Sequence, residues 1–144
     1  MGRVSTSERW ALALVVMAAL AGPAQAQSAA DRTAIEHVIA GQIGAFRKDD
    51  GPAAFAYAAP DLQMMFGDAA SFMRMVRQAY RPVYRPRSFA FGALVRSGGA
   101  LVQRVELIGP DGKPRTALYT MEHEPDGSWR IAACRLIASE ALGA

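Results

Sequence analysis

Cysteine is almost missing from this 144-residue sequence, which contains a single one, Cys134. One cysteine cannot form an intramolecular disulfide, so hydrophobic packing must hold the fold together even in an oxidising compartment. Its place near the end of the chain also argues against a lipoprotein, whose lipid is carried by a cysteine at the new N-terminus. We expect Cys134 to be a buried and inert strand residue, because the sequence places no base beside it to form the thiolate.

Histidine is scarce as well, and this weakens the case for metal chemistry. The two histidines, His37 and His123, fall on different predicted elements, and neither has the spacing of metal ligands around it. The triplet Glu122-His123-Glu124 cannot converge on one ion from a strand, since alternate side chains point to opposite faces. The sequence therefore predicts no metal site and no cofactor.

Long apolar runs are also lacking, apart from one between Trp10 and Ala21. Its length of about 12 residues is short of the ~20 that a permanent transmembrane helix needs. Two non-adjacent arginines precede the run, Gly22-Pro23 follows it, and Ala24–Ala26 supplies small residues that a signal peptidase accepts. We expect a cleavable signal peptide over residues 1–26, no transmembrane anchor after cleavage, and export to the periplasm or the medium.

Neither sign of charge dominates. Removal of Arg3, Glu8 and Arg9 with the signal peptide lowers the formal net charge from +3 to about +2. A chain so close to neutral gives little reason to expect a nucleic-acid partner, and we predict none.

Positive charge is nevertheless concentrated in one segment, which we call the arginine segment: Arg74, Arg77, Arg81, Arg85 and Arg87. Guanidinium groups bind phosphate and carboxylate in a bidentate manner, so this segment is a candidate for docking on an anionic surface. The alternative, which we favour, is a solvated helix face whose arginines pair with Asp49, Asp50 or Asp68.

The first half of the mature chain has helical periodicity. Between Asp31 and Asp49 the apolar residues recur at steps of three and four, which predicts a helix with one buried stripe. The stripe consists of Ile35, Val38, Ile39, Ile43 and Phe46. Gly41 and Gly44 weaken that helix by roughly 1 kcal/mol each relative to alanine, but they also permit a close approach by another element.

Shorter helices are expected to follow. An alanine-rich segment at 52–59 predicts a second helix that Pro60 stops, and Asp68 caps a third at 69–80. Residues 62–66 fit either a strand or a turn of helix. Pro82 and Pro86 predict an extended link after the third helix.

The second half has the alternation of strands, interrupted by glycine-containing turns. Short links make successive strands pair antiparallel, so the chain predicts an α+β fold over residues 27–144, a single domain with helices covering one face of a curved sheet of about four strands. The expected strands are 88–95, 100–108, 115–124 and 129–137.

Several strings resemble the nuclear-transport-factor-like superfamily of cone-shaped α+β domains, and within it a family of exported bacterial domains of unknown function. They are Ala45-Phe46 with Asp49-Asp50, the segment 53–60, Phe66-Gly67, Phe72, Met75-Val76, 80–83, Tyr119, Met121, 126–131 and Cys134. The resemblance implies a fold, an export address and the option of a homodimer through the open face of the sheet. It implies no catalytic residue.

Four residues are candidates for the lining of a pocket between sheet and helices: Tyr57, Gln103, Tyr119 and Met121. An apolar pocket with one or two polar groups suits a small hydrophobic ligand. The alternative is that these side chains simply fill the core, because a domain of this size has little apolar surface to spare. On the last strand we expect one face to carry Trp129, Ile131, Ala133 and Arg135, and the opposite face to carry Cys134 and Leu136.

The sequence therefore favours a non-enzymatic domain that binds a small apolar or amphiphilic ligand, or a protein partner. The alternative is an isomerase- or hydrolase-type enzyme with a tyrosine-centred pocket. A catalytic carboxylate is hard to find for it, because Asp61 lies in a turn and Glu106 has Arg104 beside it. His37 lies off the buried stripe of its helix, and we expect it to be exposed.

Overall fold

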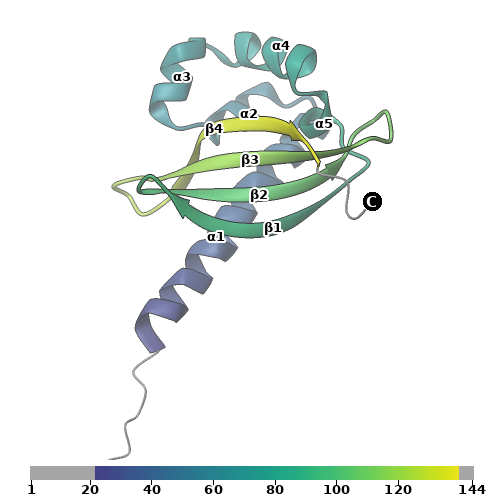
Figure 1. The fold of residues 1–144 in the computed structure, drawn as a ribbon. Helices are drawn as coiled ribbons and strands as arrows, with labels where there is room; N and C mark the ends of the chain where they lie inside the picture. Colours follow the sequence, from purple (N-terminus) through teal and green to yellow (C-terminus); the bar gives the residue numbers. More distant parts are fainter. Residues whose placement is uncertain (1–21, 140–144) are drawn as a thin grey trace, which may run out of the picture.

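A computed structural model describes residues 22–139 of the chain, and most of the expected signal peptide lies outside this range. Within it, helices come first and strands follow, as expected for an α+β protein (Figure 1). The helices are α1 (Gly22–Arg47), α2 (Gly51–Ala56), α3 (Pro60–Phe66), α4 (Ala69–Ala79) and α5 (Arg81–Tyr84), and the strands are β1 (Ser88–Ser97), β2 (Ala100–Ile108), β3 (Pro114–His123) and β4 (Trp129–Ala138).

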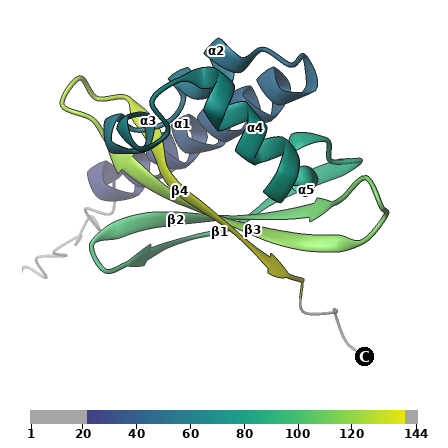
Figure 2. The same ribbon diagram turned by 90° about the horizontal axis from the view of Figure 1, so that it is seen from above.

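The strands form one open antiparallel sheet in the order β1-β2-β3-β4, as the short links predicted. Figure 2 shows the helices on one side of this sheet, with the other side uncovered. The core lies between the two layers, where apolar side chains of α1 and α4 meet those of β2 and β3. No helix in residues 22–139 is long and apolar enough to span a membrane.

Four of the five residues in the stripe predicted for α1 are buried, and the fifth, Val38, is partly buried against the core. Ile35, Ile39, Ile43 and Phe46 are each at most 1% exposed, and the helix crosses behind the sheet in Figure 1. Gly41 has the close neighbour that small residues at this spacing suggested. A Cβ built there would lie 2.7 Å from Cζ of Tyr57, so the ring occupies the space that a side chain would need.

The segment after α1 is held by caps and by one contact with the last strand. The Asp50 side chain accepts a hydrogen bond from the N–H of Ala53 at the start of α2. Pro60 occupies the first turn of α3, so 62–66 is helical rather than a strand. A parallel bridge joins Ala58 to Ile131 and ties this segment to β4.

The expectation of an extended link through Pro82 and Pro86 was wrong. Residues 81–84 form the short helix α5, in which Pro82 lies in the first turn, where a backbone N–H has no intrahelical partner to lose. Val83 is 3% exposed, so burial of its side chain stabilises this turn.

The prediction of which β4 side chains share a face of the sheet was also wrong beyond Ile131. The register passes from Met121↔Ile131 to Thr120↔Ala133, which leaves Ala132 as an extra residue in a β-bulge. After the bulge, Cys134 rather than Ala133 joins Ile131 on the side that faces the helices. The bulge thereby brings Cys134 to the wall of the pocket described next.

Candidate ligand-binding pocket

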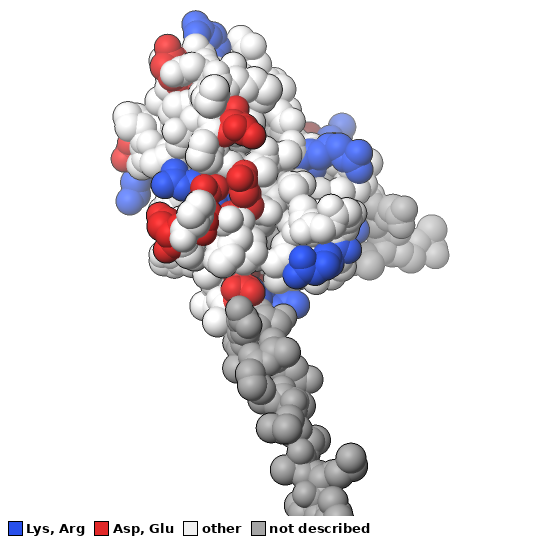
Figure 3. All heavy atoms as spheres, turned by 90° about the vertical axis from the view of Figure 1, so that its left-hand side faces the viewer, with Lys and Arg blue, Asp and Glu red and all other residues white. Residues whose placement is uncertain are grey.

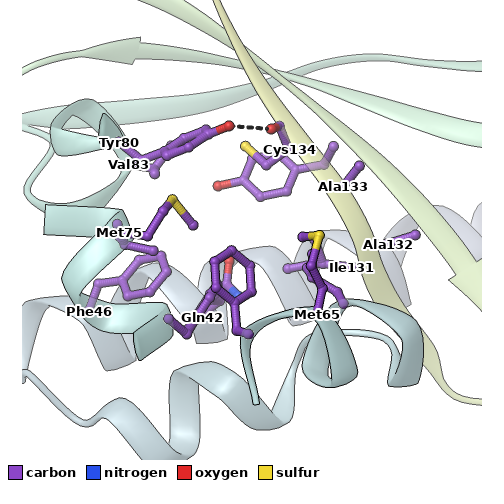
Figure 4. A pocket seen from close by; sticks show the side chains of 15 residues that line it. Gln42, Phe46, Met65, Met75, Tyr80, Val83, Ile131, Ala132, Ala133 and Cys134 are labelled. Carbon is purple, nitrogen blue, oxygen red and sulfur yellow. Dashed lines mark hydrogen bonds between the residues drawn. The ribbon is translucent and has the colours of Figure 1, made fainter. Parts of the chain in front are cut away.

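An apolar cavity of about 270 Å³ lies between the helices and β4 (Figure 4). In the close-up, Met65 and Met75 project into it from the helical side, and residues 131–134 form the opposite wall. The lining residues are Gln42, Phe46, Leu62, Met65, Phe66, Phe72, Met75, Val76, Tyr80, Val83, Tyr119, Ile131, Ala132, Ala133 and Cys134.

The polar groups of this lining are few, and most of them are engaged. The Tyr80 hydroxyl donates to the backbone carbonyl of Cys134 at 3.0 Å, the dashed line in Figure 4. The Gln42 side chain, 4% exposed, donates from Nε2 to the carbonyl of Ala54 at 3.2 Å. The Tyr119 hydroxyl oxygen is buried, and the Cys134 thiol is its polar neighbour.

Desolvation determines the protonation of two titratable lining residues, the buried Tyr119 of β3 and the partly buried Cys134 of β4. Desolvation raises the pKa of Tyr119 well above its usual value, and it raises the pKa of the Cys134 thiol to about 12. Both groups are therefore protonated at neutral pH. Tyr119 can act as a hydrogen-bond donor there, whereas Cys134 lacks the thiolate that a nucleophile requires.

Of the four pocket candidates named from the sequence, the structure places Tyr119 in the lining. Tyr57 lies outside it, with its ring against Gly41, and Met121 is in the core without lining the cavity. Gln103 is fully buried, and its amide donates to the carbonyls of Gly92 and Arg104. Gly92 lies where the β1–β2 register shifts, so Gln103 satisfies a carbonyl that regular pairing would have used.

Sequence reasoning overlooked Gln42 and the contribution of α3. Gln42 carried a usable signal, because it lies three residues after Ile39 and four before Phe46, and therefore on the buried stripe of α1. A polar side chain in such a position has to find a partner or line a cavity. Met65 gave no such signal, since it is 70% exposed and lies in a segment whose periodicity was ambiguous.

The arginine segment is bound to its own chain. Arg77 and Arg85 form ion pairs with Asp49 at 3.3 and 2.7 Å, and the Tyr84 hydroxyl donates to the same carboxylate. The Tyr84 hydrogen bond and the two guanidinium groups hold the pKa of Asp49 below its usual value.

The remaining arginines of the segment also donate to acceptors of this chain. Arg87 donates to the carbonyl of Pro110, Arg81 to that of Arg77, and Arg74 to the Ser71 hydroxyl. The face seen in Figure 3 carries both signs of charge, and several basic side chains lie beside acidic ones.

The acid–base candidates lie away from the cavity. His37 is exposed on α1, as expected. Glu106 accepts hydrogen bonds from Arg104 at 2.6 Å and from Thr116 at 2.7 Å, and neither it nor His37 lines the pocket. Within residues 22–139, no group of three or more His, Cys, Asp or Glu side chains is placed to hold a metal ion.

Residues 28–144 match the sequence model of a protein family described as Domain of unknown function (DUF4864). No curated protein and no solved structure shows significant similarity to the chain.

Proposed function

The chain belongs to the DUF4864 family of domains of unknown function, and we propose that it works by binding a small, mostly apolar molecule in the pocket between its helices and β4. The observation that carries this proposal is the cavity itself. At about 270 Å³ it exceeds the roughly 150 Å³ of an apolar cavity that binds benzene, and it approaches the ~300 Å³ at which drug-sized pockets begin.

The character of the lining supports binding over catalysis. Five of the fifteen lining residues are phenylalanine or methionine, most of the others are aliphatic, and methionine adapts its shape to apolar ligands. The titratable groups of the wall, Tyr80, Tyr119 and Cys134, all have raised pKa values and are protonated at neutral pH. They provide no general base for the isomerase or hydrolase alternative.

This proposal is tested by titrating ¹⁵N-labelled protein with a size series of neutral hydrocarbons, from toluene to 2-isopropenylnaphthalene. We expect amide shifts at the lining residues Val76, Tyr119 and Ile131, and none on the open face of the sheet. Met75→Trp fills the cavity and should abolish these shifts. Met64→Trp is the matched control, because Met64 is 80% exposed and does not line the pocket. Absence of shifts at the lining residues throughout the series would refute the proposal.

We also propose that the chain is exported after cleavage behind Ala26, and that residues 27–144 are a single domain with the cone-shaped fold of the nuclear-transport-factor-like superfamily. The charged, apolar and small-residue regions of residues 1–26 support export, and helices on one side of an open sheet support the superfamily. A homodimer through the open face of that sheet belongs to the same proposal. N-terminal sequencing of the exported product should begin at Gln27, and a product beginning at Met1 would contradict cleavage.

A further inference from the structure

Three residues of the arginine segment surround a cleft that is separate from the apolar pocket. The cleft has a volume of about 280 Å³, is open to solvent, and is lined by Arg77, Arg81, Tyr84, Arg85 and Pro110. None of these residues lines the apolar pocket. Figures 1 and 2 both place α5, which begins with Arg81, beside the turn between β2 and β3 that contains Pro110. The charged residues of this lining all carry positive charge.

Two of the three guanidinium groups are held in place by their own chain. Arg77 and Arg85 pair with Asp49 at 3.3 and 2.7 Å, and their guanidinium carbons lie 5.7 and 4.7 Å from the centre of the Tyr84 ring. Asp49 does not line the cleft, so its carboxylate leaves the space between the arginines open. Side chains that are already ordered in this way lose little freedom when an anion binds to them.

The third arginine, Arg81, has donors to spare. It is exposed, and its Nε donates to the carbonyl of Arg77 at 3.4 Å, whereas its two Nη groups have no hydrogen-bond partner among residues 22–139. Exposed ion pairs add little stability, and like charges that are brought together repel each other. Stability alone therefore does not explain why three guanidinium groups gather around one carboxylate.

A broader hollow adjoins the cleft, because Arg81 and Pro110 line both. Its volume is about 540 Å³, and its other lining residues are Ala79, Pro82, Asp111, Arg115 and Leu136. The carboxylate of Asp111 lies 3.9 Å from the guanidinium group of Arg115, which offsets its charge. The apolar side chains of this lining can contact the organic part of a molecule whose anionic group lies in the cleft.

We propose that the cleft binds the phosphate group of a small phosphate monoester, and that the adjoining hollow receives the organic part of the same molecule. A phosphate monoester carries close to two negative charges above pH 7, and guanidinium groups bind its oxygens in a bidentate manner. Arg77, Arg81 and Arg85 donate to the phosphate, and Asp49 is a positioning residue that orients two of them. This site is independent of the proposed apolar ligand, because the two sites share no lining residue.

The test is isothermal titration calorimetry of the chain with phenyl phosphate and phenyl sulfate at pH 8 and low salt. The two probes have nearly the same shape, but the phosphate carries two negative charges and the sulfate carries one. We expect phenyl phosphate to bind about tenfold more tightly than phenyl sulfate. Inorganic phosphate should bind several-fold more weakly than phenyl phosphate, because it leaves the adjoining hollow empty. In ¹⁵N-labelled protein, phenyl phosphate should shift the amides of Arg81 and Asp111 and not that of Phe66, which lines the apolar pocket.

Arg81→Gln removes one guanidinium group from the cleft and should weaken binding of phenyl phosphate about tenfold. Arg74→Gln is the matched control, because Arg74 is exposed on α4, donates to the Ser71 hydroxyl and lines neither the cleft nor the hollow. It lowers the net charge by the same amount and should change the affinity less than twofold. Thermal unfolding checks that both variants are folded, and we expect stability close to that of wild type because both side chains are exposed.

The outcomes that would overturn the proposal are distinct. Equal weakening by Arg81→Gln and Arg74→Gln would show a general effect of net charge and no cleft site. Equal affinity for phenyl phosphate and phenyl sulfate would exclude recognition of a doubly charged phosphate, and equal affinity for inorganic phosphate would exclude a role for the organic part. Absence of binding by phenyl phosphate at millimolar concentration would refute the site altogether, and the hydrocarbon titration of the apolar pocket would be unaffected.

Discussion

At the scale of single residues, one close contact in the helical layer depends on the absence of a side chain. Gly41 of α1 and the ring of Tyr57 lie against each other, while Gly44, one turn further along the same helix, has nothing within 4 Å of the place where its Cβ would be. Both glycines weaken the helix to the same extent by propensity alone. Their different surroundings make them a matched pair for separating helix propensity from packing.

We predict opposite outcomes for the two alanine variants. Gly44→Ala should raise the free energy of unfolding by roughly 0.5–1 kcal/mol, since it adds helix propensity and meets no neighbour. Gly41→Ala should lower it by about 1 kcal/mol, because the Tyr57 ring has to move and the cost of the clash exceeds the gain in propensity. Urea unfolding measures both, and equal stabilisation of the two variants would show that Tyr57 yields without cost.

At the scale of elements, sequence periodicity correctly predicts those helices and strands that bury one face against the core. The stripe of Ile35, Ile39, Ile43 and Phe46 was evident because α1 lies with one face on the core, and the four strands were evident because Gly-containing turns separate them. Local pattern is enough where an element has one buried face and a clear end.

The two wrong predictions at this scale, the extended link after α4 and the faces of β4, have physical causes that cannot be read from the local sequence pattern. Pro82 predicts an extended link, but a proline in the first turn of a helix loses no intrahelical hydrogen bond. Burial of the Val83 side chain then stabilises α5. The bulge in β4 falls at Ala132-Ala133, where two identical small residues give no polarity signal to mark the extra position. The faces of Cys134 and Arg135 could therefore not be assigned from alternation.

The candidate site was predictable only in part for the same reason. Tyr119 follows from the alternation of β3, whereas Gln103 and Met121 share its face and yet do not line the cavity. Which inward side chains meet empty space depends on the position of α3 and α4 over the sheet, and this is a tertiary property.

At the scale of the whole molecule, burial of ionisable groups makes the stability depend on alkaline pH. The Cys134 thiol has its pKa raised from 9.0 to about 12, and the pKa of Tyr119 lies well above 10.0. A raised pKa in the folded state means that the unfolded chain loses these protons first as the pH rises. The corresponding stability is complete below pH 9 and is lost between about pH 9 and 12.

We therefore predict that the free energy of unfolding falls progressively as the pH rises above 9. In Cys134→Ala the decline should be shallower, because one of the groups that titrate only in the unfolded chain has been removed. Urea unfolding at pH 7, 9 and 10.5 gives the slope of the free energy of unfolding against pH for each protein. Comparing slopes removes any constant change in stability that the substitution causes at pH 7. Identical slopes for the variant and wild type would contradict the raised pKa of the thiol.

The bridge between Ala58 and Ile131 determines how late in synthesis the pocket can form. Ribosomes deliver a chain from its N-terminus, and the cavity takes Gln42 from the first helix and Cys134 from the last strand. Every nascent form without β4 thus lacks one side of the cavity and the anchor of the loop that leads into α3. Occupancy by a ligand would accordingly report that synthesis has reached the final strand.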